Sequence, residues 1–106
     1  MDQDGHGTHC AGTIAGFNGN YSDPGTGMAP KAKLAVVDTS KLGDRYLTIY
    51  YPSAYQEDFT SMGVGVVSNS WGSDGLYNDY SKDIDHQARA NPSQLWVFAG
   101  ESVRRA

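Results

Sequence analysis

The chain has 106 residues, of which 39% are hydrophobic and 19% charged, and its formal net charge is −4 at pH 7. That length suits one modest domain, and the low charge together with seven tyrosines and two tryptophans is typical of a globular chain rather than a disordered one. No apolar stretch is long enough to cross a bilayer and the basic residues form no patch, so neither a membrane nor a nucleic-acid partner is expected.

The first predicted helix spans residues 6–16, which carry small and apolar side chains without proline. It also contains three glycines. An interior glycine costs a helix about 1 kcal/mol relative to alanine, so close packing against another backbone is expected to explain them. Residues 17–30 are rich in turn-forming residues and predict a loop. The β-branched run within residues 33–40 predicts a buried strand.

The second half of the chain alternates between helix and strand patterns. Apolar side chains at helical spacing predict a helix over residues 51–63, which ends at a glycine. A strand is expected at residues 64–70 and a loop at residues 72–78. Residues 79–91 again show helical spacing, and an Asn-Pro pair is expected to end that helix. The last strand is predicted at residues 94–100.

This order of elements predicts an α/β fold. Alternating helices and continuous apolar strands are typical of a parallel sheet, here a partial one, with helices on both faces. Functional sites in such sheets gather at the carboxyl ends of the strands. Residues 38–41, 68–72 and 100–102 are therefore expected to lie on the functional rim.

The most informative stretch is DGHGTHCAGTIAG at residues 4–16, where His6 and His9 stand three positions apart. These histidines can be structural groups bonded to the backbone, metal ligands together with Asp2 and Asp4, or groups that transfer protons in catalysis. The metal hypothesis is the weaker one, because the spacing is not His-Glu-x-x-His. A calcium loop starting at Asp2 also lacks its closing glutamate.

As a whole, this string resembles the active-site histidine segment of the subtilisin-like serine peptidases, or subtilases. The first histidine of His-Gly-Thr-His is the catalytic one in that family, which implies that His6, rather than His9, is the general base. Three further segments are similar to the same family. GMAPKAKLAVVD at residues 27–38 is similar to a core strand, SNSWG at 68–72 to the substrate-binding strand, and QLWVFAG at 94–100 to the strand before the oxyanion asparagine.

The resemblance implies a segment of the family's three-layer α/β/α fold and a peptide or protein substrate. By resemblance, Ser70, Trp71 and Gly72 bind that substrate, with ordinary core packing as the alternative for Trp71. The spacings are most similar to the KP-43-like branch of bacterial alkaline proteases. No cofactor can be assigned in the chain, although calcium is common in the family, and the family implies an extracellular location for the full-length protein.

The rest of the peptidase machinery is not found in the chain. The family's catalytic aspartate precedes the histidine segment, its Gly-Thr-Ser-Met-Ala nucleophile motif does not occur, and Glu101 stands where the oxyanion asparagine is expected. We therefore expect residues 1–106 to be an internal fragment of one subtilisin-like domain that needs the missing parts of that domain and is inactive in isolation. The alternative is a non-catalytic remnant or peptide-binding module.

Cys10 is the single cysteine, which excludes an internal disulfide. It follows His6 by one helical turn, so it is expected to be a semi-buried thiol beside that imidazole and not a nucleophile. The alternative is a plain buried small residue.

Overall fold

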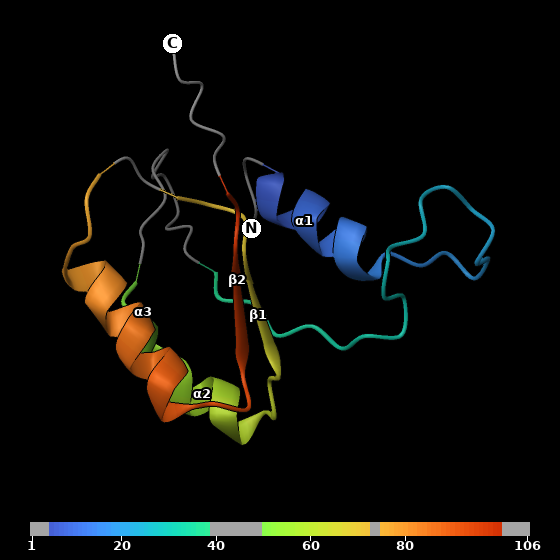
Figure 1. Ribbon diagram of the computed structural model, residues 1–106. Coiled ribbons are helices and arrows are strands. Elements are labelled where there is room, and N and C mark those ends of the chain that lie inside the picture. The colour runs from blue at the N-terminus through green and yellow to red at the C-terminus, as the bar shows by residue number, and fades with distance from the viewer. Residues whose placement is uncertain (1–4, 39–49, 73–74, 101–106) are drawn as a thin grey trace, which may run out of the picture. The chain divides into compact units, whose positions relative to one another are not determined.

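The computed structural model describes residues 5–38, 50–72 and 75–100 (Figure 1). The backbone contacts divide the chain into two compact units, Met1–Ile49 and Tyr50–Ala106. None of the helices in the described ranges is long and apolar enough to span a membrane.

In the first unit, α1 (His6–Ala15) forms the predicted helix. It begins after Gly5, whose φ of +79° lies in the left-handed region that glycine enters without a steric penalty. The carbonyl of Gly5 accepts the amide of His9 at 2.9 Å, which closes the first turn. Gly16 is the first residue beyond the helix, one position earlier than the end of the predicted range.

The carboxyl end of α1 is held by the backbone of a neighbouring segment. Three consecutive amides donate to carbonyls there: Gly27 to Gly16 at 2.7 Å, Met28 to Thr13 at 3.1 Å and Ala29 to Ile14 at 2.7 Å. A helix leaves its last carbonyls unpaired, so these bonds complete it. A Cβ atom on Gly27 would lie 2.6 to 2.7 Å from backbone atoms of residues 14–16, which is too close for any side chain. The close packing is made at Gly27 and, just beyond the helix, at Gly16, whose Cβ atom would lie 3.2 Å from the Gly25 carbonyl oxygen. The expectation is wrong for Gly12, inside the helix, which has open space beside it.

Residues 17–30 form the predicted loop, and its own polar side chains organise it. Side-chain oxygens of Asn18, Asn20 and Asp23 each accept the backbone amide two residues further on, at 2.7 to 3.1 Å. Asn18 also donates to the Asp23 carboxylate at 2.7 Å. The bonds from the Gly25 amide and from Asn18 hold the pKa of Asp23 below its ordinary value.

The strand predicted at residues 33–40 is wrong over residues 33–38, which form neither helix nor strand; residues 39–40 lie outside the described ranges. Leu34 and Val36 are 47% and 75% exposed. A strand needs a neighbour to which it can hydrogen-bond, and a β-branched run alone does not supply one. The composition correctly indicates an apolar segment, but no strand in the described part of its unit pairs with it.

The described part of the second unit contains two strands joined through a helix: β1 (Val66–Asn69), α3 (Asp79–Ala90) and β2 (Leu95–Phe98). β1 and β2 are parallel, with Val66 opposite Leu95 and Asn69 opposite Phe98. The predicted α/β fold with a partial parallel sheet is therefore confirmed. Both strands are shorter than the predicted ranges, because the ladder pairs four residues of each.

The helix predicted over residues 51–63 is interrupted. A short 3₁₀ helix, η1 (Pro52–Ala54), is followed by α2 (Gln56–Ser61), and Tyr55 between them has a φ of −127°, outside the helical range. A tertiary contact holds the first piece, because Asp83 of α3 accepts the Ser53 amide at 2.9 Å. The predicted glycine stop is confirmed: Gly63 has a φ of +71°.

α3 follows its sequence signals closely. Asn78 accepts the Ser81 amide at 3.0 Å, and Ser81 in turn accepts the Asn78 amide at 3.4 Å, which together cap the first turn. The helix stops at Asn91, directly before Pro92, as predicted.

The core of the second unit is small and polar in part. Among its described residues, the buried side chains are Pro52, Gln56, Phe59, Val67 and Asn69. Within this unit α2 and α3 lie on the same side of the two strands (Figure 1). On the opposite face, Val66, Leu95 and Val97 remain 61%, 60% and 45% exposed.

Candidate functional site

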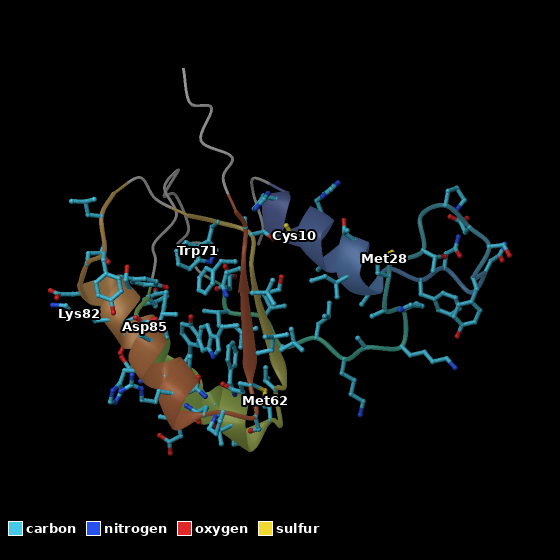
Figure 2. The ribbon with its side chains drawn as sticks, in the orientation of Figure 1. Cys10, Met28, Met62, Trp71, Lys82 and Asp85 are labelled. Atoms are coloured by element: carbon cyan, nitrogen blue, oxygen red, sulfur yellow. The ribbon has the colours of Figure 1, made fainter. Side chains whose placement is uncertain are left out.

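His6 is the first residue of α1, and its side chain is exposed. The Sγ atom of Cys10, one turn later, lies 3.7 Å from His6 Nε2, and the thiol is half-buried; Figure 2 labels Cys10 on α1. The expectation of a semi-buried thiol beside this imidazole is confirmed. The helix therefore presents an accessible imidazole whose neighbour one turn away is a soft, weakly bonding sulfur.

His9 has different surroundings. It borders a shallow hollow of about 380 Å³ whose other walls include Thr13, Pro24 and Met28. In residues 5–38, 50–72 and 75–100, no group of three or more His, Cys, Asp or Glu side chains could hold a metal ion. Asp2 and Asp4, the other members of the metal hypothesis, lie outside these ranges. The metal hypothesis for His6 and His9 is therefore not tested by the described residues.

Ser70, Trp71 and Gly72 directly follow β1. Trp71 is half-buried, and its ring meets Tyr80 and Phe98 edge-on, at centroid distances of 5.4 and 6.0 Å (Figure 2). The indole thus takes part in ordinary packing, the alternative role considered for it, while its two neighbours are exposed. Edge-to-face contacts of this kind are favourable and directional, so they fix the middle of the segment.

The direction of this segment is set where β1 ends. The amide of Ala99 donates to the carbonyl of Asn69 at 3.0 Å. Because the peptide group is planar and trans, its C=O and N–H point in opposite directions. With the Asn69 carbonyl directed toward residue 99, beyond the end of β2, the Ser70 N–H points to the opposite edge of β1. The described part of the chain places no third strand at that edge.

Asn69 itself was not singled out from the sequence. Its side chain is 6% exposed, and its Nδ2 donates to the carbonyls of Val67 at 3.4 Å and Val97 at 3.2 Å. The alternation of β1 offered a signal, since Val67 and Asn69 are the two buried positions and an amide at the second requires partners.

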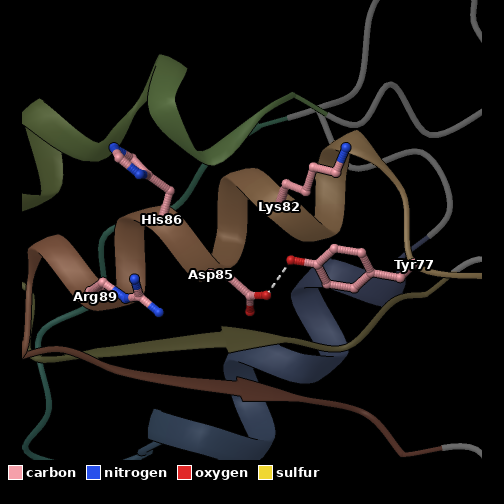
Figure 3. Close-up of a pocket in the computed structure, with 5 residues that line it drawn as sticks. All are labelled: Tyr77, Lys82, Asp85, His86 and Arg89. Atoms are coloured by element: carbon pink, nitrogen blue, oxygen red, sulfur yellow. Dashed lines mark hydrogen bonds between the residues drawn. The ribbon is translucent and has the colours of Figure 1, made fainter.

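A second hollow lies along α3, and its lining contains none of the candidate site residues predicted from the sequence. Its lining residues are all exposed: Tyr77, Lys82, Asp85, His86 and Arg89 (Figure 3). Tyr77 donates to Asp85 at 2.5 Å, which raises the pKa of the phenol, and Lys82 pairs with Asp79 at 3.3 Å. Exposed pairs of this kind are typical of a solvated helix face.

His6 belongs to the first unit, and Ser70, Trp71 and Gly72 belong to the second. Of the other expected rim residues, Asp38 and Gly100 end described segments, whereas 39–41 and 101–102 lie outside the described ranges. Glu101, expected in place of the oxyanion asparagine, is among the latter.

Comparison with known proteins places the chain in a family. The chain matches the family described as "Subtilase family" (Peptidase_S8) over residues 1–101. It is also similar to "Serine protease AprX" of Bacillus subtilis (strain 168), with 32% identity over 88 residues. That alignment covers 77% of this chain and 20% of the relative, so the chain spans about a fifth of the relative's length. No solved structure matches the chain significantly.

Proposed function

Since this chain belongs to the subtilase family, we propose that it forms part of the catalytic domain of a serine endopeptidase, in which His6 is the general base. The family match over residues 1–101 carries the proposal. The reaction is hydrolysis of a peptide bond through an acyl-enzyme, and the nucleophilic serine and the orienting aspartate come from other parts of the full-length protein.

His6 is suited to proton transfer by its place and its chemistry. An imidazole ring nitrogen can take up the proton of a serine hydroxyl and return it to the leaving amine. The exposed position at the start of α1 allows another part of the domain to approach it. His9, which borders a separate hollow, has no part in this proposal.

Residues 70–72 are proposed to bind the substrate as an added strand. An extended peptide that pairs with a sheet edge uses main-chain hydrogen bonds for affinity. The Ser70 N–H points away from β2, toward the edge of β1 where such a peptide would lie. The Trp71 ring is held against Tyr80 and Phe98, which orders the segment before substrate arrives.

Three finer statements belong to the same proposal. The motif spacings support a place in the KP-43-like alkaline branch, and the family supports an extracellular location for the full-length protein. Calcium is common in the family and is proposed for the full-length protein, without an assigned set of ligands in this chain.

The test uses the full-length protein that carries this chain and a fluorogenic peptide. His6→Ala should lower kcat by at least about a hundredfold, the usual lower bound for loss of a general acid–base group. His9→Ala is the matched control, three residues away on the same helix, and should retain activity within a few-fold. Wild-type protein without hydrolysis, or equal loss in both variants, would contradict the proposal. A flanking sequence lacking the aspartate strand and the serine motif would favour the peptide-binding module instead.

A further inference from the structure

One buried side chain joins the two strands at the point where the proposed substrate segment begins. The Nδ2 group of Asn69 carries two donors, one of which reaches Val67 O on its own strand and the other Val97 O on β2. The backbone carbonyl of the same residue accepts the Ala99 amide. The side chain of Asn69 is therefore bonded to β2, and its main-chain carbonyl is bonded to Ala99, the residue after β2.

Burial alone does not require an amide on this face of β1. The preceding inward position on β1 is Val67, 7% exposed, so the interior accepts an apolar residue there. A buried amide is unfavourable unless its hydrogen bonds are made, and when made they impose direction that apolar contacts do not. Asn69 thus contributes orientation at the last paired position of the ladder between β1 and β2.

We propose that Asn69 is a positioning residue for peptide binding: its side-chain amide fixes the end of β1 against β2 and thereby the direction of the Ser70 backbone. This inference rests on the proposed function of residues 70–72 as the substrate strand. The plane of the peptide group between Asn69 and Ser70 sets where the Ser70 N–H points. If the end of β1 tilts, every main-chain bond between the segment and a substrate loses alignment together.

The consequence depends on substrate length. An extended peptide pairs with the backbone of residues 70–72, whereas an amino-acid ester with a single residue engages that backbone far less. Replacing Asn69 by leucine keeps the approximate volume and removes both side-chain bonds. We expect kcat/KM for the extended peptide to fall about tenfold more than for the ester, mainly through KM, as the loss of one or two well-aligned hydrogen bonds implies.

The experiment measures kcat and KM of the full-length protein on both substrates for wild type, Asn69→Leu and a matched control. Asn91→Leu is that control, because the Asn91 amide also donates to a backbone carbonyl, Gln87 O at 2.8 Å, but at the end of α3. The control variant should lower kcat/KM equally for both substrates or leave it unchanged. If Asn69→Leu does not accumulate as folded protein, Asn69→Val takes its place, because valine already occupies the preceding inward position of β1.

The inference is supported if kcat/KM falls selectively for the extended peptide in the Asn69 variant and not in the Asn91 control. Equal loss on both substrates, or no loss, overturns it while leaving the peptidase proposal intact. Wild-type protein that hydrolyses neither substrate overturns the peptidase proposal and, with it, the role of Asn69.

Discussion

The contact between Gly27 and the end of α1 gives the sharpest prediction about stability. A methyl group on Gly27 would sit 2.6 Å from the Gly16 nitrogen and 2.7 Å from backbone atoms of Ala15 and Ile14. All of these are backbone atoms, so no side chain can rotate away to make room. Gly27→Ala is expected to push residues 27–29 away from the helix.

The magnitude follows from the bonds that such a movement breaks. Three amides of residues 27–29 donate to the end of α1. Each backbone hydrogen bond contributes a net of about 0.5 to 1.5 kcal/mol, so three contribute about 1.5 to 4.5 kcal/mol to the local closed state. A free energy of about 1.4 kcal/mol corresponds to a factor of ten in an equilibrium constant. The rate of amide exchange at residues 27–29 should therefore rise by a factor of about 10 to 1,000. Hydrogen exchange followed by mass spectrometry measures this directly on the chain.

Gly12→Ala is the matched control for that experiment. It makes the same chemical change inside α1, where a Cβ atom would meet no heavy atom within 4 Å apart from the backbone of its own helix. Replacing an interior helical glycine by alanine should stabilise the helix by about 0.5 to 1 kcal/mol and slow exchange. Unchanged exchange at residues 27–29 in Gly27→Ala would refute the packing argument, and faster exchange in Gly12→Ala would show that another surface packs closely on this face of α1.

Three further predictions concern activity and pH. The 106-residue chain by itself should hydrolyse no fluorogenic peptide, because it carries His6 without the Gly-Thr-Ser-Met-Ala nucleophile motif; turnover that His6→Ala abolishes would contradict this. In the full-length protein, a mercurial should inhibit through Cys10, whose thiol lies 3.7 Å from the His6 imidazole, while Cys10→Ala keeps activity; inactivity of a folded Cys10→Ala protein would assign the thiol a larger role. Burial raises the pKa values of Tyr55 and Tyr80 above the ordinary 10.0, so the folded chain holds phenolic protons that the unfolded chain releases. The contribution of these tyrosines to the free energy of unfolding should be fully present below pH 10.0 and should be lost as the pH rises above it. Urea titrations followed by tryptophan fluorescence should show a smaller loss in Tyr80→Phe than in the wild type. An equal loss in both proteins would refute this cause.

Elements with local signals could be predicted from the sequence. Asn91 and Pro92 end α3, and Gly63 follows α2 in a left-handed conformation, where the sequence placed these stops. The distance between His6 and Cys10 also follows from helical spacing alone, since residues four apart lie on one face. In each case the cause lies within a few residues along the chain, so the amino-acid order suffices.

Contacts between distant segments decided what the sequence could not. Residues 33–38 have the composition of a strand but do not form one in the described structure, because strand formation requires a partner from elsewhere in the fold. The first turn of the helix predicted from residue 51 became a separate 3₁₀ piece, held by Asp83 from 30 positions away. Asn69, at the end of β1 and directly before the proposed substrate segment, finds one of its hydrogen-bond partners in the carbonyl of Val97, 28 residues later. A buried amide is tolerated where its partners converge, and that convergence is a property of the folded chain rather than of the residues next to it in sequence.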